Sequence, residues 1–123
     1  MREILFRGKR KNGEWVQGCY ILWNGKHCIY DDVIYYEFLP ETIGQYTGLT
    51  DKNGTKIFEG DVIVYNDDVR YGVFWSESEH AFYIEGIGYT DLDRLGNLYG
   101  FLCEVIGNIH DNPELLKSEV QGE

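Results

Sequence analysis

The fold of this chain is decided by one stretch of sequence: Thr47-Gly48-Leu49-Thr50-Asp51-Lys52-Asn53-Gly54-Thr55-Lys56-Ile57-Phe58-Glu59-Gly60-Asp61-Val62-Ile63-Val64-Tyr65. Asn53 and Gly54 predict a tight hairpin turn, because both residues tolerate the positive φ that such turns require. Gly60 and Asp61 predict a second turn, and the run of β-branched residues 62–64 followed by Tyr65 predicts a core strand. The stretch therefore predicts a β fold, and it contains no residues that specify a reaction.

Outward from this stretch, short apolar runs alternate with turn residues, which is typical of a chain built from β-strands. The expected elements before it are strands at 3–7 and 15–23 around a turn at 11–14, then strands at 27–30 and 33–38, ended by Pro40. The expected elements after it are strands at 57–58, 62–65, 69–75, 81–85 and 103–109, a long loop at 86–100 with a helical turn at 92–95, and a short helix at 112–116.

The close succession of these strands predicts a mainly β fold: an SH3-like five-stranded barrel with an additional N-terminal β-hairpin layer and a short C-terminal helical turn. The predicted boundaries are 1–45 for the hairpin layer, 46–116 for the barrel and 117–123 for a frayed tail, in one compact unit. A chain of 123 residues is long enough for one domain with a real core.

Composition restricts where the protein works. No run of 18 apolar residues is present, so we expect no membrane association, and the charged N-terminus is not followed by the apolar region of a signal peptide. We therefore expect a cytoplasmic protein. The cysteines Cys19, Cys28 and Cys103 are odd in number, which predicts reduced thiols, and their apolar neighbours predict small core residues.

Charge is distributed unevenly along the chain. The net charge is −10, but residues 1–11 sum to +4 and residues 12–123 to −14. An acidic body repels a phosphate backbone, so nucleic acid is disfavoured over most of the surface. The basic residues Arg7, Lys9, Arg10 and Lys11 form a candidate patch for an acidic partner, and a solvated turn is the alternative reading.

Three ligand-binding motifs fail on inspection. Gly8 and Gly13 have the spacing of a phosphate-binding loop, but Glu14 stands where that loop requires Lys. The calcium-loop pattern beginning at Asp51 has its glycine two positions early, and the glycines at 86–88 lack the third glycine of a dinucleotide fingerprint. We therefore expect no cofactor at these segments.

Catalytic and metal sites are also not predicted. The cysteines and the three histidines lack metal-ligand spacing, and Cys103, which could pair with His80 or His110, begins a predicted core strand. Glu77 and Glu79 lie in a predicted turn, where nothing raises the pKa of a carboxyl group. No catalytic residue and no metal ligand is assigned, and we expect a protein that is not an enzyme.

Aromatic residues suggest a binding role instead. The chain has 10 Tyr, 6 Phe and 3 Trp, which suit protein contacts with one apolar side and one polar tip. Both faces of the predicted strand 15–23 are apolar, so we expect it to be covered on two sides or to lie at a subunit contact. Its candidate self-assembly or partner residues are Trp15, Tyr20 and Trp23.

Several blocks of the sequence resemble the YopX family. They are Phe6-Arg7-Gly8-Lys9, Asn12-Gly13-Glu14-Trp15-Val16, Gly44-Gln45-Tyr46-Thr47-Gly48-Leu49-Thr50-Asp51-Lys52-Asn53-Gly54, Ile57-Phe58-Glu59-Gly60-Asp61-Val62, Glu104-Val105-Ile106-Gly107-Asn108-Ile109 and Asn112-Pro113-Glu114-Leu115-Leu116. The resemblance implies a bacteriophage or prophage protein of a bacterial host, with a mainly β fold, oligomeric assembly and no assigned catalytic residues. Gly13, Gly54 and Gly60 read as structural turn positions.

The sequence leaves several functions open. The first is a non-enzymatic phage or prophage accessory protein of uncharacterised role that self-assembles and binds a host or phage protein. One alternative is a single-stranded nucleic-acid module that uses Arg7, Lys9, Arg10 and Lys11 as phosphate contacts, with Trp15 or Tyr20 stacking on bases. The other is a DNA mimic, in which the acidic body would occupy the DNA groove of an enzyme.

Overall fold

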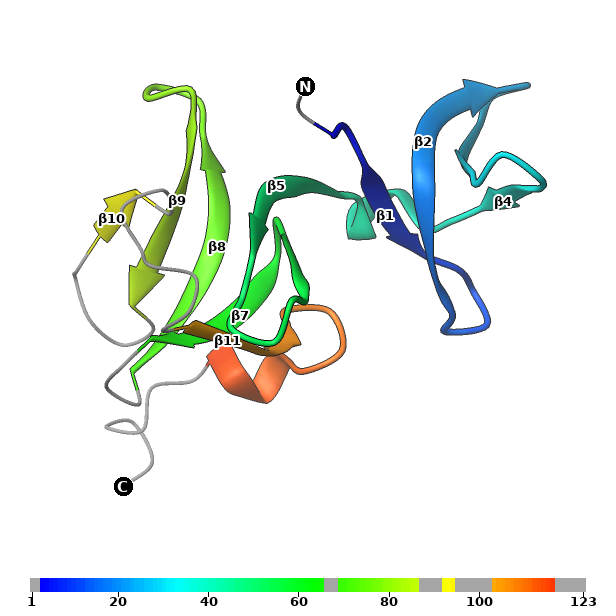
Figure 1. Ribbon diagram of the computed structural model, residues 1–123. Coiled ribbons are helices and arrows are strands. Elements are labelled where there is room, and N and C mark those ends of the chain that lie inside the picture. Colours follow the sequence, from blue (N-terminus) through cyan, green and yellow to red (C-terminus); the bar gives the residue numbers. More distant parts are fainter. Residues whose placement is uncertain (1–2, 66–68, 87–91, 95–102, 117–123) are drawn as a thin grey trace. The chain divides into compact units, whose positions relative to one another are not determined.

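A computed structural model describes residues 3–65, 69–86, 92–94 and 103–116 (Figure 1). These residues form a mainly β structure, which confirms the predicted class. The strands are β1 (Phe6–Lys9), β2 (Trp15–Trp23), β3 (Lys26–Tyr30), β4 (Tyr35–Glu37), β5 (Gly44–Thr50), β6 (Lys56–Phe58), β7 (Asp61–Tyr65), β8 (Arg70–Ser76), β9 (Ala81–Gly86), β10 (Leu92–Arg94) and β11 (Cys103–Asn108). Short 3-10 helices are described at η1 (Pro40–Thr42) and η4 (Pro113–Leu116).

The strands form two antiparallel sheets. The first has the strand order β4-β3-β2-β1-β5-β6, and the second has the order β10-β9-β8-β7-β11. Within the described ranges the second sheet ends at β10 on one side and at β11 on the other, and no closed barrel is found. The five strands expected to close into a barrel are instead divided between the sheets: β7, β8, β9 and β11 lie in the second sheet and β6 lies in the first.

The chain divides into two compact units, Met1–Gly48 and Leu49–Glu123. The sequence placed a boundary between residues 45 and 46, which lies within β5, and expected one compact unit. Strand β5 carries the chain from the first unit into the second. Each unit has its own buried cluster, so each is described by itself.

Strand β2 organises the first unit by pairing with a different neighbour along each half. Its first half pairs with β1, with Val16 opposite Gly8, and its second half pairs with β3, with Tyr20 opposite Ile29. Gly18 lies where the pairing changes, and a Cβ atom there would lie 2.1 Å from the carbonyl oxygen of Tyr30. Only glycine allows this approach of the two backbones.

The core of the first unit is small. Val16, Ile29 and Phe38 are buried, with Phe6, Tyr36 and Ile43 packed partly buried against them. Phe38 occupies the space above Gly8, because a Cβ atom at Gly8 would lie 2.4 Å from the Phe38 ring.

Helix η1 fastens the end of this unit to β1. The Thr42 hydroxyl accepts a hydrogen bond from the Lys9 amide at 2.8 Å and donates one to the Leu39 carbonyl at 2.6 Å. Pro40 ends the strand region, as the sequence predicted, and it starts this 3-10 turn.

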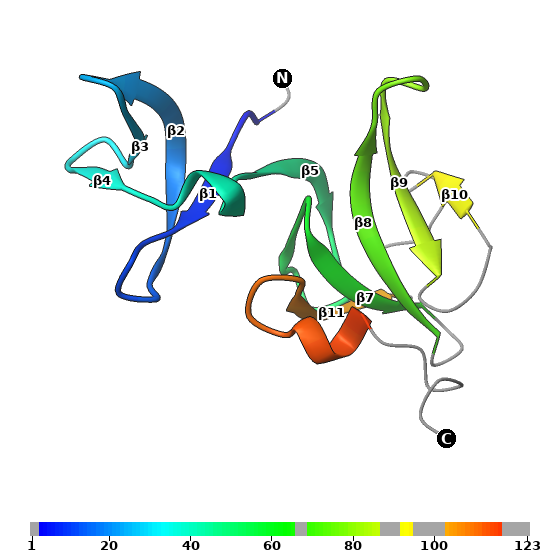
Figure 2. The same cartoon turned by 180° about the vertical axis from the view of Figure 1, so that it is seen from behind.

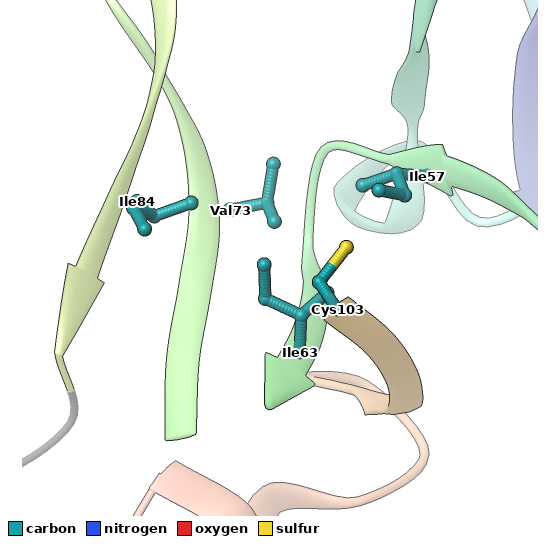
Figure 3. Close-up of a cluster of buried hydrophobic side chains, with 5 residues drawn as sticks. All are labelled: Ile57, Ile63, Val73, Ile84 and Cys103. Carbon is teal, nitrogen blue, oxygen red and sulfur yellow. The ribbon is translucent and has the colours of Figure 1, made fainter. Parts of the chain in front are cut away.

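The second unit contains the larger described cluster (Figure 3). Ile57, Ile63, Val73, Ile84 and Cys103 come from β6, β7, β8, β9 and β11 and are at most 4% exposed. The core strand at residues 62–65 that the sequence predicted is β7, and Val62 and Ile63 are completely buried. Burial of such side chains stabilises the unit by about 1.5–3 kcal/mol for each residue.

Two predictions are wrong in detail. Residues 92–94 form strand β10, which pairs with β9, instead of a helical turn (Figure 2). Pairing with a neighbouring strand outweighs the local helical preference. Cys19 is exposed and is not a core residue, whereas Cys28 and Cys103 are buried as expected. The predicted tail 117–123 lies outside the described residues.

The close approach at Gly18 predicts a strong effect of one methyl group. We expect Gly18→Ala to destabilise the first unit by about 1–3 kcal/mol, because the Cβ atom would overlap a backbone carbonyl that cannot move freely. Thermal unfolding followed by circular dichroism measures the loss. The control is Gly72→Ala in β8, where a Cβ atom meets nothing within 4 Å. Equal melting temperatures for the two variants would contradict the packing described here.

Candidate functional site

The end of the first unit formed by the second half of β2, β3 and β4 exposes an unusual number of apolar side chains. Six of the ten large hydrophobic residues found exposed among the described residues lie between positions 20 and 35. We call these six the apolar tip: Tyr20, Leu22, Trp23, Val33, Ile34 and Tyr35. Their exposures range from 38% for Tyr20 to 79% for Val33, so the tip is a concentrated apolar surface of the kind that marks interaction sites.

On one face of the tip, aromatic rings stack on one another. The ring of Tyr35 lies 4.4 Å from that of Tyr30 and 6.0 Å from that of Trp23, between ring centroids. Cys28, which lies on the same face by strand alternation, is only 4% exposed. Because the rings of Trp23 and Tyr35 stack on their neighbours, they are held in place before any partner binds. This lowers the conformational entropy that binding would cost.

The opposite face of the tip carries a second aromatic group. Tyr20 contacts Phe6, His27 and Phe38 with ring centroids 5.7 to 6.0 Å apart, and its hydroxyl is hydrogen-bonded to Nδ1 of His27 at 2.5 Å. Leu22, directly opposite His27 in the sheet, is 63% exposed. Both faces of this end of the sheet are thus apolar and in contact with solvent.

The structure separates the three residues that the sequence proposed as one assembly surface. Trp15 and Trp23 share a parity but lie at opposite ends of β2, about 26 Å apart along the strand. Tyr20 has the opposite parity and belongs to the other face. Of the three, Trp23 and Tyr20 belong to the apolar tip and Trp15 does not. The sequence reasoning missed Tyr35, Val33 and Ile34, whose signal is an apolar run directly after Asp31-Asp32.

Arg7 and Arg10 of the candidate basic patch contact other side chains of the first unit. The Arg7 guanidinium lies 4.8 Å from the centre of the Trp15 ring, and its Nε and Nη2 atoms are buried. Arg10 forms an ion pair with Glu14 at 2.6 Å and lies 5.0 Å above the Tyr36 ring. Lys11 is exposed. These contacts reduce the number of cations that the patch can offer to phosphates.

A cavity of about 260 Å³ lies beside this turn. It is lined by Arg10, Lys11, Asn12, Glu37 and Phe38. The lining places the basic turn of the β1–β2 hairpin next to the C-terminal end of β4. Both signs of charge line the cavity, so it has no clear preference for an anion.

The thiol that could act as a nucleophile lies in the wrong environment. Cys103 is 1% exposed, and burial, with a smaller effect of the Asp51 charge, raises the pKa of its thiol. A protonated, buried thiol is unreactive. Among the residues that the structure describes, no three His, Cys, Asp or Glu side chains gather as metal ligands. None of the described helices is long and apolar enough to cross a bilayer.

Asp51 is a buried carboxylate of the second unit, and it organises the hairpin turn. Its Oδ1 atom accepts hydrogen bonds from the amides of Asn53 and Thr55, each at 2.9 Å, and its Oδ2 atom accepts one from the amide of Val105 at 2.9 Å. Gly54 completes the turn with a φ of 80°. The carboxylate therefore joins the turn to strand β11, 54 residues along the chain.

These contacts determine how Asp51 titrates. Burial acts to raise the pKa of Asp51, but the amide hydrogen bonds from Val105, Thr55 and Asn53, with the nearby charge of Lys52, lower it below the ordinary value of 3.8. Hydrogen bonds to a carboxylate favour its charged form. The arrangement is that of a structural anion.

Comparison with known proteins gives a family and a fold. The model of the family described as YopX protein matches residues 6–117. The crystal structure of protein EF1440 from Enterococcus faecalis is similar, with a TM-score of 0.58 and 26% sequence identity over 95% of this chain and 100% of that one. No curated protein matches the chain.

The Asp51 contacts predict a graded loss of stability. Asp51→Ala removes the acceptor for three amides, and we expect it to destabilise the second unit by at least about 2 kcal/mol. Asp51→Asn keeps one acceptor oxygen and should lose less. Urea unfolding measures both, and Asp32→Asn, at an exposed position, is the control with no expected loss. An alanine variant as stable as the control would show that the carboxylate is dispensable.

The lowered pKa of Asp51 predicts a pH window. The carboxylate contributes its full stabilisation above pH 3.8, and this contribution disappears as the pH falls through the lower pKa of the folded state. The difference in unfolding free energy between the wild type and Asp51→Asn should therefore shrink below pH 3.8. Denaturant unfolding at a series of pH values measures it. A difference that stays constant to pH 2 would refute the depressed pKa.

Proposed function

We propose that this chain, which belongs to the YopX family, is not an enzyme and acts by binding protein, beginning with a second copy of itself. The observation that carries this proposal is the apolar tip, where Trp23 and Tyr35 are stacked, exposed and preorganised. A strand with apolar side chains on both faces of its sheet is stable when other elements pack on both faces. The described residues of the first unit leave both faces exposed at this end. A partner would supply the missing cover.

The choice of protein over nucleic acid follows from charge and geometry. The net charge of −10 opposes a phosphate backbone. Arg7 stacks on Trp15 and Arg10 is paired with Glu14, so a stacking groove with free cations is not formed at these residues. Aromatic residues on a neutral apolar surface are the usual anchors of protein contacts.

The biological setting of the proposal is an accessory role in a bacteriophage or prophage. We also propose that the second unit belongs to the SH3-like class. The support is that β7, β8 and β9 are successive neighbours in its sheet and that β11 lies beside β7. Scaffolds of this kind host many unrelated functions, so the fold alone names no partner.

Self-association is tested by light scattering behind size exclusion. At tens of micromolar we expect at least a dimer for the wild type. Trp23→Ser combined with Tyr35→Ser should weaken association by 10-fold or more, because aromatic anchors at the centre of an interface contribute about 2 kcal/mol or more each. Ile106→Ser in β11, where the side chain is 39% exposed, is the matched control and should associate as the wild type does.

Two outcomes would overturn the proposal. One is a wild-type monomer at tens of micromolar. The other is an oligomer that the paired serine substitutions leave unchanged, since the apolar tip would then not be the contact. A salt-dependent shift of labelled single-stranded DNA at low protein concentration would favour the nucleic-acid module instead.

A further inference from the structure

Strand β4 is an edge of the first sheet. Two hydrogen bonds show which of its backbone groups face the neighbouring strand β3. The Phe38 amide donates to the His27 carbonyl at 3.1 Å, and the Asp31 amide donates to the Ile34 carbonyl at 3.2 Å. In an antiparallel ladder, successive residues direct their backbone groups alternately toward and away from the neighbouring strand. Residues 34, 36 and 38 therefore face β3, and Tyr35 and Glu37 direct their amide and carbonyl groups outward.

Among the described residues, this edge lacks most of the devices by which proteins protect an exposed strand. Such devices are lysine or proline on the edge, a β-bulge, or a covering segment. Strand β4 consists of Tyr35, Tyr36 and Glu37, and it follows directly on Val33 and Ile34, which are 79% and 49% exposed. Its protection is its short length and one acidic residue. The edge is thus open for strand addition, with an apolar surface around it.

We propose that a second copy of this chain adds its β4 to this edge, antiparallel, around a two-fold axis at Tyr36. Each copy then donates its Tyr35 amide to the Glu37 carbonyl of the partner and its Glu37 amide to the Tyr35 carbonyl of the partner. All four outward groups of each strand are satisfied by the same two residues in the other copy, as an isologous contact requires. This inference rests on the proposed self-association and specifies its geometry.

Charge favours a second copy as the occupant. An antiparallel arrangement sets the C-terminal end of one β4 beside the N-terminal end of the other. The exposed acids Asp31 and Asp32 precede β4, whereas the basic turn with Lys11 lies beside its C-terminal end, around the cavity that Glu37 and Phe38 also line. Two-fold symmetry brings the acidic turn of each copy toward the basic turn of the other, twice.

The rings of the apolar tip give the contact its energy. A few edge hydrogen bonds contribute little net free energy, because they replace bonds to water. Tyr35 and its stacked neighbour Trp23 lie on the same face and would continue across the joined sheets as one apolar surface. In this register Glu37 lies opposite Tyr35 of the partner, so no two carboxylates face each other directly.

Amide hydrogen exchange followed by NMR tests the pairing without any substitution. At high protein concentration the Tyr35 and Glu37 amides should be protected at least 10-fold more than in a dilute monomeric sample. The amides of Tyr36 and Phe38, which face β3, should be protected at both concentrations and serve as the internal control. If light scattering shows a dimer while the Tyr35 and Glu37 amides exchange freely, the edge pairing is refuted and the self-association stands.

A matched pair of substitutions at Glu37 gives the second readout. Glu37→Pro removes an outward amide and leaves the bonds to β3 intact, and we expect it to weaken dimerisation at least 10-fold. Glu37→Ala removes the charge but keeps the amide, so it should associate as tightly as the wild type or more tightly. Equal association of the two variants, with the first unit folded in both, would contradict the proposal. A wild type that stays monomeric removes the proposed function and this pairing together.

Charge pairing across the two-fold axis is tested through Lys11. Lys11→Glu should weaken the dimer, because it would place a like charge near Asp32 of the partner subunit. Adding Asp32→Asn should recover part of that loss, since the repelling charge is removed. Losses that simply add, with no recovery, would show that the two turns do not meet.

Discussion

One buried carboxylate connects two segments of the second unit that lie 54 residues apart in the sequence. Asp51 accepts amides from its own turn and from Val105 in β11, and β11 in turn pairs with β7 in the core of the sheet. Hydrogen bonds to a charged acceptor contribute about 1.5–3 kcal/mol each. The neighbouring ion pair between Lys52 and Glu104, at 3.6 Å and about half exposed, contributes at most about 1 kcal/mol. The carboxylate is therefore the stronger of these two side-chain links, and its role is structural.

The first unit is held together differently, by close backbone contact. Phe38 lies in the space that a Cβ atom at Gly8 would take, and the Tyr30 carbonyl fills the corresponding space at Gly18. These contacts enclose a core of only three buried residues. So small a core cannot cover both faces of a nine-residue strand, and the apolar tip beyond it remains in solvent. The apolar tip therefore results from a strand that has many apolar residues and a core too small to bury all of them.

Much of the architecture could be predicted from local chemistry. The hairpin turn at Asn53-Gly54, the apolar strand after Gly60-Asp61 and the 3-10 turn at Pro113 each follow from backbone preferences that act within a few residues. The strand at Leu92–Arg94 could not be predicted, because pairing with β9 decides it and that partner is not visible in the local sequence. Whether the second sheet closes is likewise a property of all its strands together.

The candidate site shows the same division between local and distant information. Alternating apolar residues at 15–23 correctly indicated a strand, but this alternation alone could not show that Arg7 stacks on Trp15. It also could not show that Tyr35, from another strand, would stack beside Trp23. Ring contacts across strands depend on register, and register depends on turns elsewhere in the chain.

An apolar surface alone would bind without specificity, because burial of hydrophobic area has no direction. The strand edge adds direction, since backbone donors and acceptors at Tyr35 and Glu37 accept only an extended partner in matching phase. The acidic and basic turns at the two ends of β4 add polarity, which distinguishes antiparallel from parallel addition. Geometry of this kind supports the proposed role in protein binding. The thiol of Cys103, buried and with a raised pKa, is correspondingly used for packing.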